Sequence, residues 1–185
     1  MCDSKTRDII ELSPENGNMQ AIIQDALLSA RKVVLRGGIF ETGPIDIPSD
    51  TELRIEEDSI LRFIPEFGEY GPVYSRWEGV KCWCMHPCIF IDNAENVVLS
   101  GKGTVDGSGD VWWKEYQGQK ENGISSPSTP IELRFQAMNP DYESQPGGGG
   151  GRQIQFLRPP LLQIKDSNNV SVKELFFTNS PFWTI

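Results

Sequence analysis

The sequence predicts an all-β protein of the β-solenoid class, in which short strands wind into stacked coils behind an N-terminal helix. Three observations lead to this prediction: one amphipathic stretch near the N-terminus, short alternating strands with no helical pattern between them, and a faint internal repeat. Repetition of one structural unit is typical of solenoids, because each coil buries its apolar face only against its neighbours.

The amphipathic stretch spans residues 16–30. Its apolar residues recur at the spacings i, i+3, i+4, i+7, i+8 and i+11, which place them on one face of a helix. They are Met19, Ile22, Ile23, Ala26, Leu27 and Ala30. Asn16 or Asn18 can cap this helix by accepting backbone N–H bonds in its first turn. We expect the helix to cover the open edge of the first coil, so that residues 1–32 form a capping segment and residues 33–185 form the coils.

Strand-like segments follow at residues 32–36, 44–47, 51–55 and 59–63. Ile45 and Ile47 alternate with polar neighbours, which is the period of two expected when one face of a strand is buried. No helical pattern separates these segments. This excludes the alternating β-α order of doubly wound sheets and leaves a sandwich, a barrel or a solenoid.

An internal repeat favours the solenoid. Residues 88–101 resemble residues 160–173, and each copy has an apolar strand, a polar turn that ends in Asn-Val and a second short strand. The two asparagines are Asn96 and Asn169, and a turn-forming pair follows each of them at the same distance. A β-sandwich is the alternative, but the Asn-Gly and Asp-Gly turns of its hairpins are mostly missing between the strands.

A long interruption at about residues 108–157 separates the two copies. It holds a Ser- and Pro-rich cluster and the run Gly147–Gly151. The run is not a phosphate-binding loop, because neither Lys-Ser/Thr nor a helix follows it, and we expect a flexible connector. Trp112-Trp113 is expected to anchor the start of this insertion by burying a large apolar area.

Composition excludes several classes of partner. A net charge of −9 argues against nucleic-acid binding and against docking on anionic membranes. A locally basic cleft is compatible with this charge, because screening limits exposed charges to a range of about 8–10 Å. The chain has no apolar run long enough to span a membrane, and its first residues lack a secretory signal, so the expected location is the cytoplasm unless a leader was removed.

Cys82, Cys84, His86 and Cys88 lie close together in the sequence, and a zinc site is one interpretation of them. Structural zinc sites favour two separated ligand pairs, and no second pair exists here. Reduced, partly buried thiols are therefore favoured, His86 is expected to be structural, and no metal or cofactor is predicted.

Three motifs occur in order at residues 100–113 (SGKGTVDGSGDVWW), 156–163 (FLRPPLLQ) and 178–185 (TNSPFWTI). Together they resemble the first half of glycoside hydrolase family 28, the polygalacturonase family. The opening helix and Gly38–Ile45 are similar to the family's cap and first coils, and residues 74–79 are similar to the branch whose members trim chain ends or act on branched pectins.

The resemblance implies a right-handed parallel β-helix that is incomplete at its C-terminal end. It also implies exo-acting hydrolysis of α-1,4-galacturonosyl linkages with inversion, in which one carboxylic acid protonates the leaving oxygen and a carboxylate activates water. The family's Asn-Thr-Asp, Asp-Asp, Gly-His-Gly and Arg-Ile-Lys motifs are absent from this sequence and are expected beyond Ile185. No catalytic residue is therefore assigned, and the chain alone is expected to be inactive.

Asp106 and Asp110 could form a carboxylate pair, but Asp-Gly is typical of a turn.

Arg76, Trp77, Glu78 and Arg158 are the candidate substrate-binding residues. Arg76 can hold a galacturonate carboxylate through two parallel N–H bonds, and the flat indole of Trp77 can stack on a sugar face. In the structural alternative, Trp77 packs its loop against the coils and Arg76 pairs with Glu78. Arg158 either steadies a turn or reaches the cleft, and Phe182 and Trp183 are expected to stack between coils.

The expected partners are pectin-derived galacturonate oligosaccharides or polysaccharide, and neither nucleic acid nor a membrane. A rhamnogalacturonan hydrolase of the same family is one alternative. A non-catalytic polysaccharide-binding solenoid or a truncated inactive product is another. A pectate lyase would need calcium bound by clustered acidic residues, and the run Glu56-Glu57-Asp58 is more typical of a solvated turn.

Overall fold

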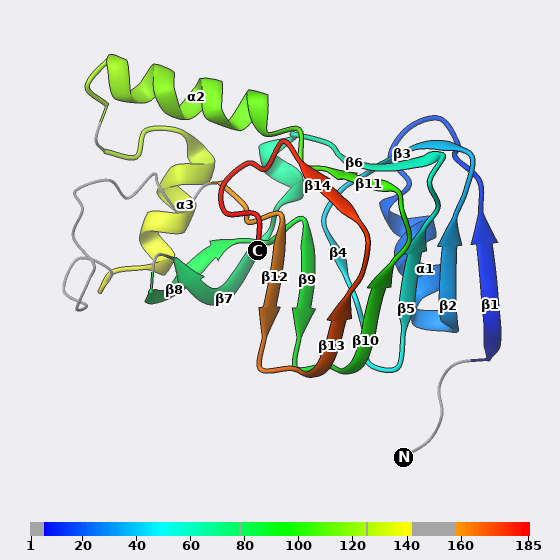
Figure 1. Ribbon diagram of the computed structural model, residues 1–185. Coiled ribbons are helices and arrows are strands. Elements are labelled where there is room, and N and C mark those ends of the chain that lie inside the picture. The colour runs from blue at the N-terminus through cyan, green and yellow to red at the C-terminus, as the bar shows by residue number, and fades with distance from the viewer. Residues whose placement is uncertain (1–5, 78, 125, 142–157) are drawn as a thin grey trace.

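The computed structural model describes residues 6–77, 79–124, 126–141 and 158–185 (Figure 1). The elements in chain order are β1 (Arg7–Leu12), α1 (Gln20–Ser29), β2 (Ala30–Leu35), β3 (Gly38–Thr42), β4 (Ile45–Asp46), β5 (Glu52–Ile55), β6 (Ser59–Phe63), η1 (Phe67–Glu69), β7 (Pro72–Trp77), β8 (Val80–Met85), β9 (Ile89–Asp92), β10 (Glu95–Ser100), β11 (Thr104–Asp106), α2 (Gly109–Glu121), α3 (Pro130–Met138), β12 (Leu162–Lys165), β13 (Asn168–Val172) and β14 (Phe176–Thr178). No helix among the described residues is long and apolar enough to cross a bilayer.

The strands form a right-handed parallel β-helix, as the sequence predicted. Its three parallel sheets have the strand orders β1-β2-β5-β10-β13, β14-β11-β6-β3 and β12-β9-β4. Within a coil, successive strands therefore belong to different sheets, and each coil contributes one strand to each sheet it reaches. Coil 1 contains β2, β3 and β4, coil 2 contains β5, β6 and β9, and coil 3 contains β10, β11 and β12; β13 and β14 begin the next coil.

The core lies inside the coils, where residues in equal register stack on one another. In one sheet Phe40 pairs with Leu61 and Leu61 with Val105, and all three side chains are fully buried. Ile45 and Ile89 stack in the same way in a second sheet. Side chains of a strand alternate between its two faces. When strands of neighbouring coils pair without a one-residue shift, inward-facing apolar residues therefore stack on inward-facing apolar residues.

Helix α1 covers the first coil and begins later than its apolar pattern does. Its buried residues are Ile23, Ala26 and Leu27, whereas Ile22, which the pattern placed on the same stripe, is 40% exposed. Asn18 performs the predicted capping: its Oδ1 accepts the backbone N–H of Gln20 at 2.9 Å and that of Gly43 at 3.1 Å. The asparagine thus joins the start of the helix to the first coil.

The repeated Asn-Val turns lie side by side, which confirms the internal repeat. Val97 pairs with Val170 in the parallel register of β10 and β13. Asn96 Nδ2 donates to Asp50 Oδ1 and Asn169 Nδ2 donates to Asn96 Oδ1, both at 2.8 Å. All three ladder residues have positive φ, between 52° and 57°, a conformation that Asn and Asp adopt more readily than other side chains.

Two expectations about the elements were wrong. Strand β1 extends the sheet before α1, so the N-terminal segment is more than a capping helix. The insertion contains helices α2 and α3 rather than only a loop, although its glycine run lies outside the described residues. Helix α3 begins with a capping box between Thr129 and Glu132, and Pro130 follows the cap. That Thr-Pro-Ile-Glu signal was readable in the sequence.

The cysteine-containing segment forms a hairpin, which the sequence did not predict. Strands β7 and β8 pair antiparallel, and the turn between them includes Gly79 at φ +88°. The hairpin leaves coil 2 between β6 and β9, and α2 and α3 leave coil 3 between β11 and β12. Figure 1 shows both insertions at the same end of the coil stack. Asn139, at the end of α3, accepts the N–H of Trp83 at 2.7 Å and donates to its carbonyl at 2.8 Å, so the insertions are joined.

Candidate functional site

Arg76 and Trp77 end strand β7, and Glu78 lies outside the described residues. Their side chains point in opposite directions, as neighbours on a strand must. Arg76 is exposed, whereas Trp77 is 1% exposed and stacks on Phe182, with ring centroids 4.0 Å apart and an interplanar angle of 9°. A covered ring face leaves no room for a sugar, so this geometry favours the packing alternative for Trp77.

Arg76 lines a groove of about 510 Å³ between the hairpin and the last coil. We call it the hairpin groove. The other lining residues that matter here are Gln163, Phe182 and Trp183, and no Asp or Glu is among the lining residues that the structure describes. Ser75 Oγ donates to Gln163 Oε1 at 2.8 Å, which orients the amide. Trp183 is 56% exposed and stacks on Phe182 at 5.5 Å.

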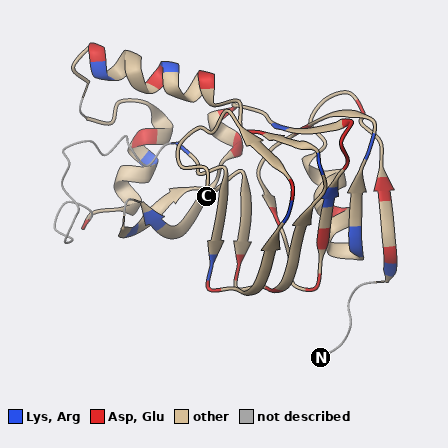
Figure 2. Ribbon diagram, viewed as in Figure 1, with Lys and Arg blue, Asp and Glu red and all other residues tan. Residues whose placement is uncertain are grey.

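The charge in the hairpin groove differs from that of the whole chain. Figure 2 shows acidic and basic residues interspersed along the strands and α2, and the net charge is −9. Among the described residues, the side chains that line the hairpin groove nevertheless include one arginine and no Asp or Glu. It can therefore attract an anion despite the acidic exterior, because exposed charges act only over short range in salt. Sequence reasoning placed Gln163 in no site, because coil stacking brings it to Ser75 from 88 positions away.

Arg158 does not reach the hairpin groove. Its guanidinium lies 4.0 Å from the ring centroid of Tyr116, 4.3 Å from that of Trp113 and 4.8 Å from that of Phe182. Its Nη1 donates to the Pro181 carbonyl at 3.5 Å. Contact of a cation with several ring faces stabilises both. These contacts agree with the alternative in which Arg158 steadies the chain near its two prolines.

The paired tryptophans anchor α2 to the coils, as expected from the sequence. Trp112 is fully buried against Phe67 and Tyr70, with ring centroids at 4.3 and 5.1 Å. Trp113 Nε1 donates to the Ser180 carbonyl at 3.0 Å. The two side chains therefore attach the first turn of α2 to two places, the segment around Phe67 and Tyr70 and the segment at Ser180.

Asp106 has the bonding pattern of a turn residue. Its Oδ1 accepts the Ser108 N–H at 2.9 Å and the Asn179 amide at 3.2 Å, and its Oδ2 accepts Arg62 Nε at 3.2 Å. Asp110 is exposed in the first turn of α2, where its backbone N–H donates to Asn179 Oδ1. A carboxylate held by three donors is fixed in place, which agrees with the interpretation of Asp106 as a turn residue.

The cysteine thiols and the imidazole of His86 contact different partners. Cys82 and Cys84 share a thiol hydrogen bond, and that bond together with burial raises the pKa of the Cys84 thiol. Burial also raises the pKa of Cys88, whose Sγ lies 4.0 Å from Tyr70 Oη. His86 Nε2 lies 3.3 Å from Asp46 Oδ1. Within the part of the chain that the structure describes, no three His, Cys, Asp or Glu side chains form a metal-binding group.

The acidic run that a lyase would require is engaged in turn contacts. Glu56 Oε1 lies 2.9 Å from Arg54 Nε and 3.7 Å from Arg36 Nη2. Asp58 Oδ1 accepts the Gly37 N–H at 3.2 Å. These carboxylates face cations and a backbone donor, which is the pattern of a surface turn between coils rather than of a calcium cage.

Comparisons with known proteins agree with this architecture. No family model matches the chain. A probable polygalacturonase of Vitis vinifera is 22% identical over 176 residues, which cover 88% of this chain and 29% of the relative. The chain also matches the crystal structure of a hyperthermoactive exopolygalacturonase from Thermotoga maritima with a TM-score of 0.71 and 25% identity, over 95% of this chain and 43% of that one.

Two further structures share the fold at lower identity. The polygalacturonase from Erwinia carotovora ssp. carotovora has a TM-score of 0.62 at 21% identity and covers 96% of this chain and 43% of its own. The family 28 exopolygalacturonase of Yersinia enterocolitica has a TM-score of 0.64 at 15% identity, over 96% of this chain and 35% of its own. The chain thus spans less than half the length of these four relatives. Along nearly its whole length the chain is thus similar in sequence to polygalacturonases, and it shares its β-helix fold with an exopolygalacturonase of family 28.

Proposed function

We propose that the chain forms part of a pectin-directed hydrolase that cleaves α-1,4-galacturonosyl linkages. The observation that carries this proposal is the match to the Thermotoga maritima exopolygalacturonase, with a TM-score of 0.71 over 95% of this chain at 25% identity. The chemistry is hydrolysis with inversion, which requires one carboxylic acid and one carboxylate on opposite faces of the scissile bond. We place this pair outside the 185 residues, because Asp106 is engaged in a turn and the family's catalytic motifs are absent from the sequence.

An exo-acting enzyme is the form of this function that the insertions support. The hairpin, α2 and α3 project together from one end of the coil stack, and the hairpin groove lies between the hairpin and the last coil (Figure 1). Projections beside a groove can block the passage of an extended polymer. A chain end would still fit, so terminal sugars would be removed one at a time.

The activity is tested with this chain and with a form extended through the catalytic motifs. We expect the 185-residue chain to release no reducing ends from polygalacturonate, because it lacks the acid and the base. The extended form is expected to release monomeric galacturonate from the start, with inverted anomeric configuration by proton NMR. Hydrolysis by the short chain would contradict the placement of the catalytic pair, and early release of mixed oligomers would contradict exo action.

Arg76 is expected to bind the substrate carboxylate. Replacing it with alanine should weaken binding of trigalacturonate by about tenfold, because a charge-assisted pair is lost. Isothermal titration of the wild type and the variant measures this effect. Lys81→Ala is the matched control, since Lys81 faces Arg76 across the hairpin but does not line the hairpin groove. Equal affinities of Arg76→Ala and wild type would remove Arg76 from the site.

A rhamnogalacturonan hydrolase is the second candidate, since residues 74–79 are similar to the branch that includes enzymes acting on branched pectins. It predicts that the extended form cleaves the alternating rhamnose–galacturonate backbone in preference to polygalacturonate. Parallel assays on the two polymers decide between the candidates.

A further inference from the structure

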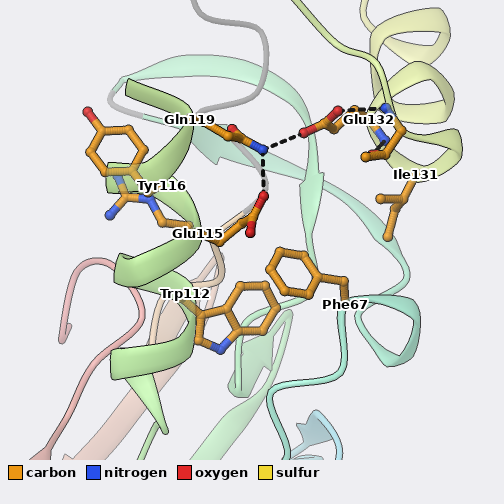
Figure 3. Close-up of a pocket in the computed structure, with 9 residues that line it drawn as sticks. Phe67, Trp112, Glu115, Tyr116, Gln119, Ile131 and Glu132 are labelled. Atoms are coloured by element: carbon orange, nitrogen blue, oxygen red, sulfur yellow. Dashed lines mark hydrogen bonds between the residues drawn. The ribbon is translucent and has the colours of Figure 1, made fainter. Parts of the chain in front are cut away.

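A second cavity lies between α2 and α3, away from the hairpin groove. It has a volume of about 210 Å³ and shares no lining residue with the hairpin groove. We call it the interhelix pocket. Figure 3 shows Trp112 and Phe67 on one side of it and the side chains of Glu115, Gln119 and Glu132 on the other. Each of these residues belongs to α2, α3 or η1, so among the described residues the pocket lies mainly between the insertion and one turn of coil 2.

The aromatic side of the interhelix pocket is preformed. Trp112 is fully buried, and its ring lies 4.3 Å from that of Phe67 at an interplanar angle of 42°. Ile131 of α3 adds an aliphatic wall. Phe67 and Ile131 are half-buried and offer the apolar surface to a small ligand, whereas the buried Trp112 holds the Phe67 ring in place. Concave sites of this kind pair apolar walls with a few placed polar groups.

The polar side of the interhelix pocket presents hydrogen-bond acceptors. Gln119 Nε2 donates to Glu115 Oε1 at 3.0 Å and to Glu132 Oε1 at 2.9 Å, as Figure 3 shows. Both amide hydrogens are then used, since a primary amide has two. The amide oxygen of Gln119 and the carboxylate of the exposed Glu115 remain as acceptors, whereas the buried Glu132 already accepts from Gln119, Ser128 and Thr129. A ligand that suits this rim must supply donors of its own.

The rim is also anionic. Burial raises the pKa of Glu132, but the backbone N–H groups of Thr129 and Ser128 outweigh burial and hold the pKa below its ordinary value. Each of those N–H groups donates to Glu132 Oε2 at 2.8 Å. The carboxylate is therefore charged at neutral pH and rigidly placed. A ligand that carries its own carboxylate would meet like charges here.

Arg158, the one cation among the lining residues that the structure describes, is directed elsewhere. Arg158 is 7% exposed, its guanidinium lies over the rings of Tyr116 and Trp113, and it donates to the Pro181 carbonyl. It therefore offers no exposed charge to an anionic ligand. The interhelix pocket and the hairpin groove thus differ in charge, because the hairpin groove has an exposed arginine and no acidic residue.

We propose that the interhelix pocket binds a neutral sugar unit, a pyranose without a carboxylate. The apolar face of the sugar would lie on the half-buried Phe67 and Ile131, and its hydroxyls would donate to the oxygens of Glu115 and Gln119. The choice of a sugar among hydroxyl-bearing ligands rests on the proposed function. In this arrangement the hairpin groove takes acidic units of the polymer and the interhelix pocket takes neutral units beside them.

Saturation-transfer NMR on the whole chain tests this inference, with galactose, rhamnose, galacturonate and tetramethylammonium as probes. Galactose or rhamnose is expected to receive saturation in the wild type and to lose at least tenfold in affinity in Ile131→Phe, whose larger side chain fills the interhelix pocket. Leu133→Phe is the matched control, because Leu133 lies on the same helix and is 48% exposed. Melting temperatures near that of the wild type show that both variants fold.

Galacturonate separates this inference from the proposed function. Its signal should be lost in Arg76→Ala and unchanged in Ile131→Phe, whereas the neutral sugar should respond in the opposite way. A galacturonate signal that Ile131→Phe removes would overturn the assignment to neutral sugars. Tetramethylammonium that displaces the neutral sugar would likewise overturn it in favour of a cation site, and absence of any neutral-sugar signal would refute it. If the wild type binds the neutral sugar but gives no galacturonate signal, that result counts only against the proposed function.

Discussion

Replacing Gly101 with alanine is expected to lower the free energy of unfolding by about 3–4 kcal/mol. Gly101 follows β10 at φ +110°, a conformation that side chains rarely adopt. A Cβ atom there would also meet the backbone carbonyl of Ile55, at the end of β5 in the coil below. Backbone atoms held in a parallel ladder cannot move aside without breaking the stack. Urea denaturation followed by circular dichroism measures the effect.

Gly118→Ala is the matched control for this substitution. Gly118 lies inside α2, and a Cβ atom added there has no heavy atom within 4 Å. Alanine in a helix interior is favoured over glycine, so this variant should gain about 0.5–1 kcal/mol. A Gly101→Ala variant as stable as the wild type would mean that coils 2 and 3 do not approach this closely at their corner.

Trp77→Ala is expected to cost about 3–5 kcal/mol of unfolding free energy. Trp77 is 1% exposed and stacks on Phe182, so truncation leaves a large cavity between the hairpin and the last coil. Its indole N–H is buried with no hydrogen-bond partner among the described residues. Trp77→Phe keeps much of the packing and removes that donor, so it should cost less than half as much.

Trp83→Ala is the control for the role of Trp77. Trp83 lies on the paired strand β8, is 36% exposed and makes an edge contact with Tyr74 at 5.5 Å. Its loss should cost less than about 1 kcal/mol. The two roles considered for Trp77 also separate here. A Trp77→Ala variant of normal stability that no longer binds trigalacturonate would show that the indole contacts sugar rather than packs the hairpin.

Much of the coil architecture follows from local sequence. The alternation around Ile45 and Leu53 predicts strands with one buried face, and the matching Asn96-Val97 and Asn169-Val170 turns predict coils in equal register. Turn chemistry explains why these signals are readable. An asparagine at positive φ and an amide ladder between coils both favour Asn at a fixed position of each coil, so the repeated Asn-Val pair can be recognised in the sequence.

The helices of the insertion could be read only in part. Helix α3 has a capping box that the sequence shows directly, from Thr129 to Glu132. Helix α2 has no side-chain cap and has a glycine inside it, so its own sequence argues weakly for a helix. It is stabilised where Trp112 packs on Phe67 and Tyr70, which belong to coil 2. Tertiary packing routinely outweighs helix propensity in this way.

The candidate sites mark the limit of what the sequence by itself determined. It identified Arg76 as a carboxylate-binding candidate and the order of the coils, because both depend on residue type and short spacing. Only the tertiary structure showed that Trp77 is covered and that Arg158 lies between aromatic rings. Only the tertiary structure, likewise, showed that Gln163 and Trp183 line the same groove as Arg76. The interhelix pocket likewise joins residues of α2, α3 and coil 2. Contacts of this kind depend on which coils stack and on where two insertions meet, and no local pattern records the meeting of segments so far apart in the chain.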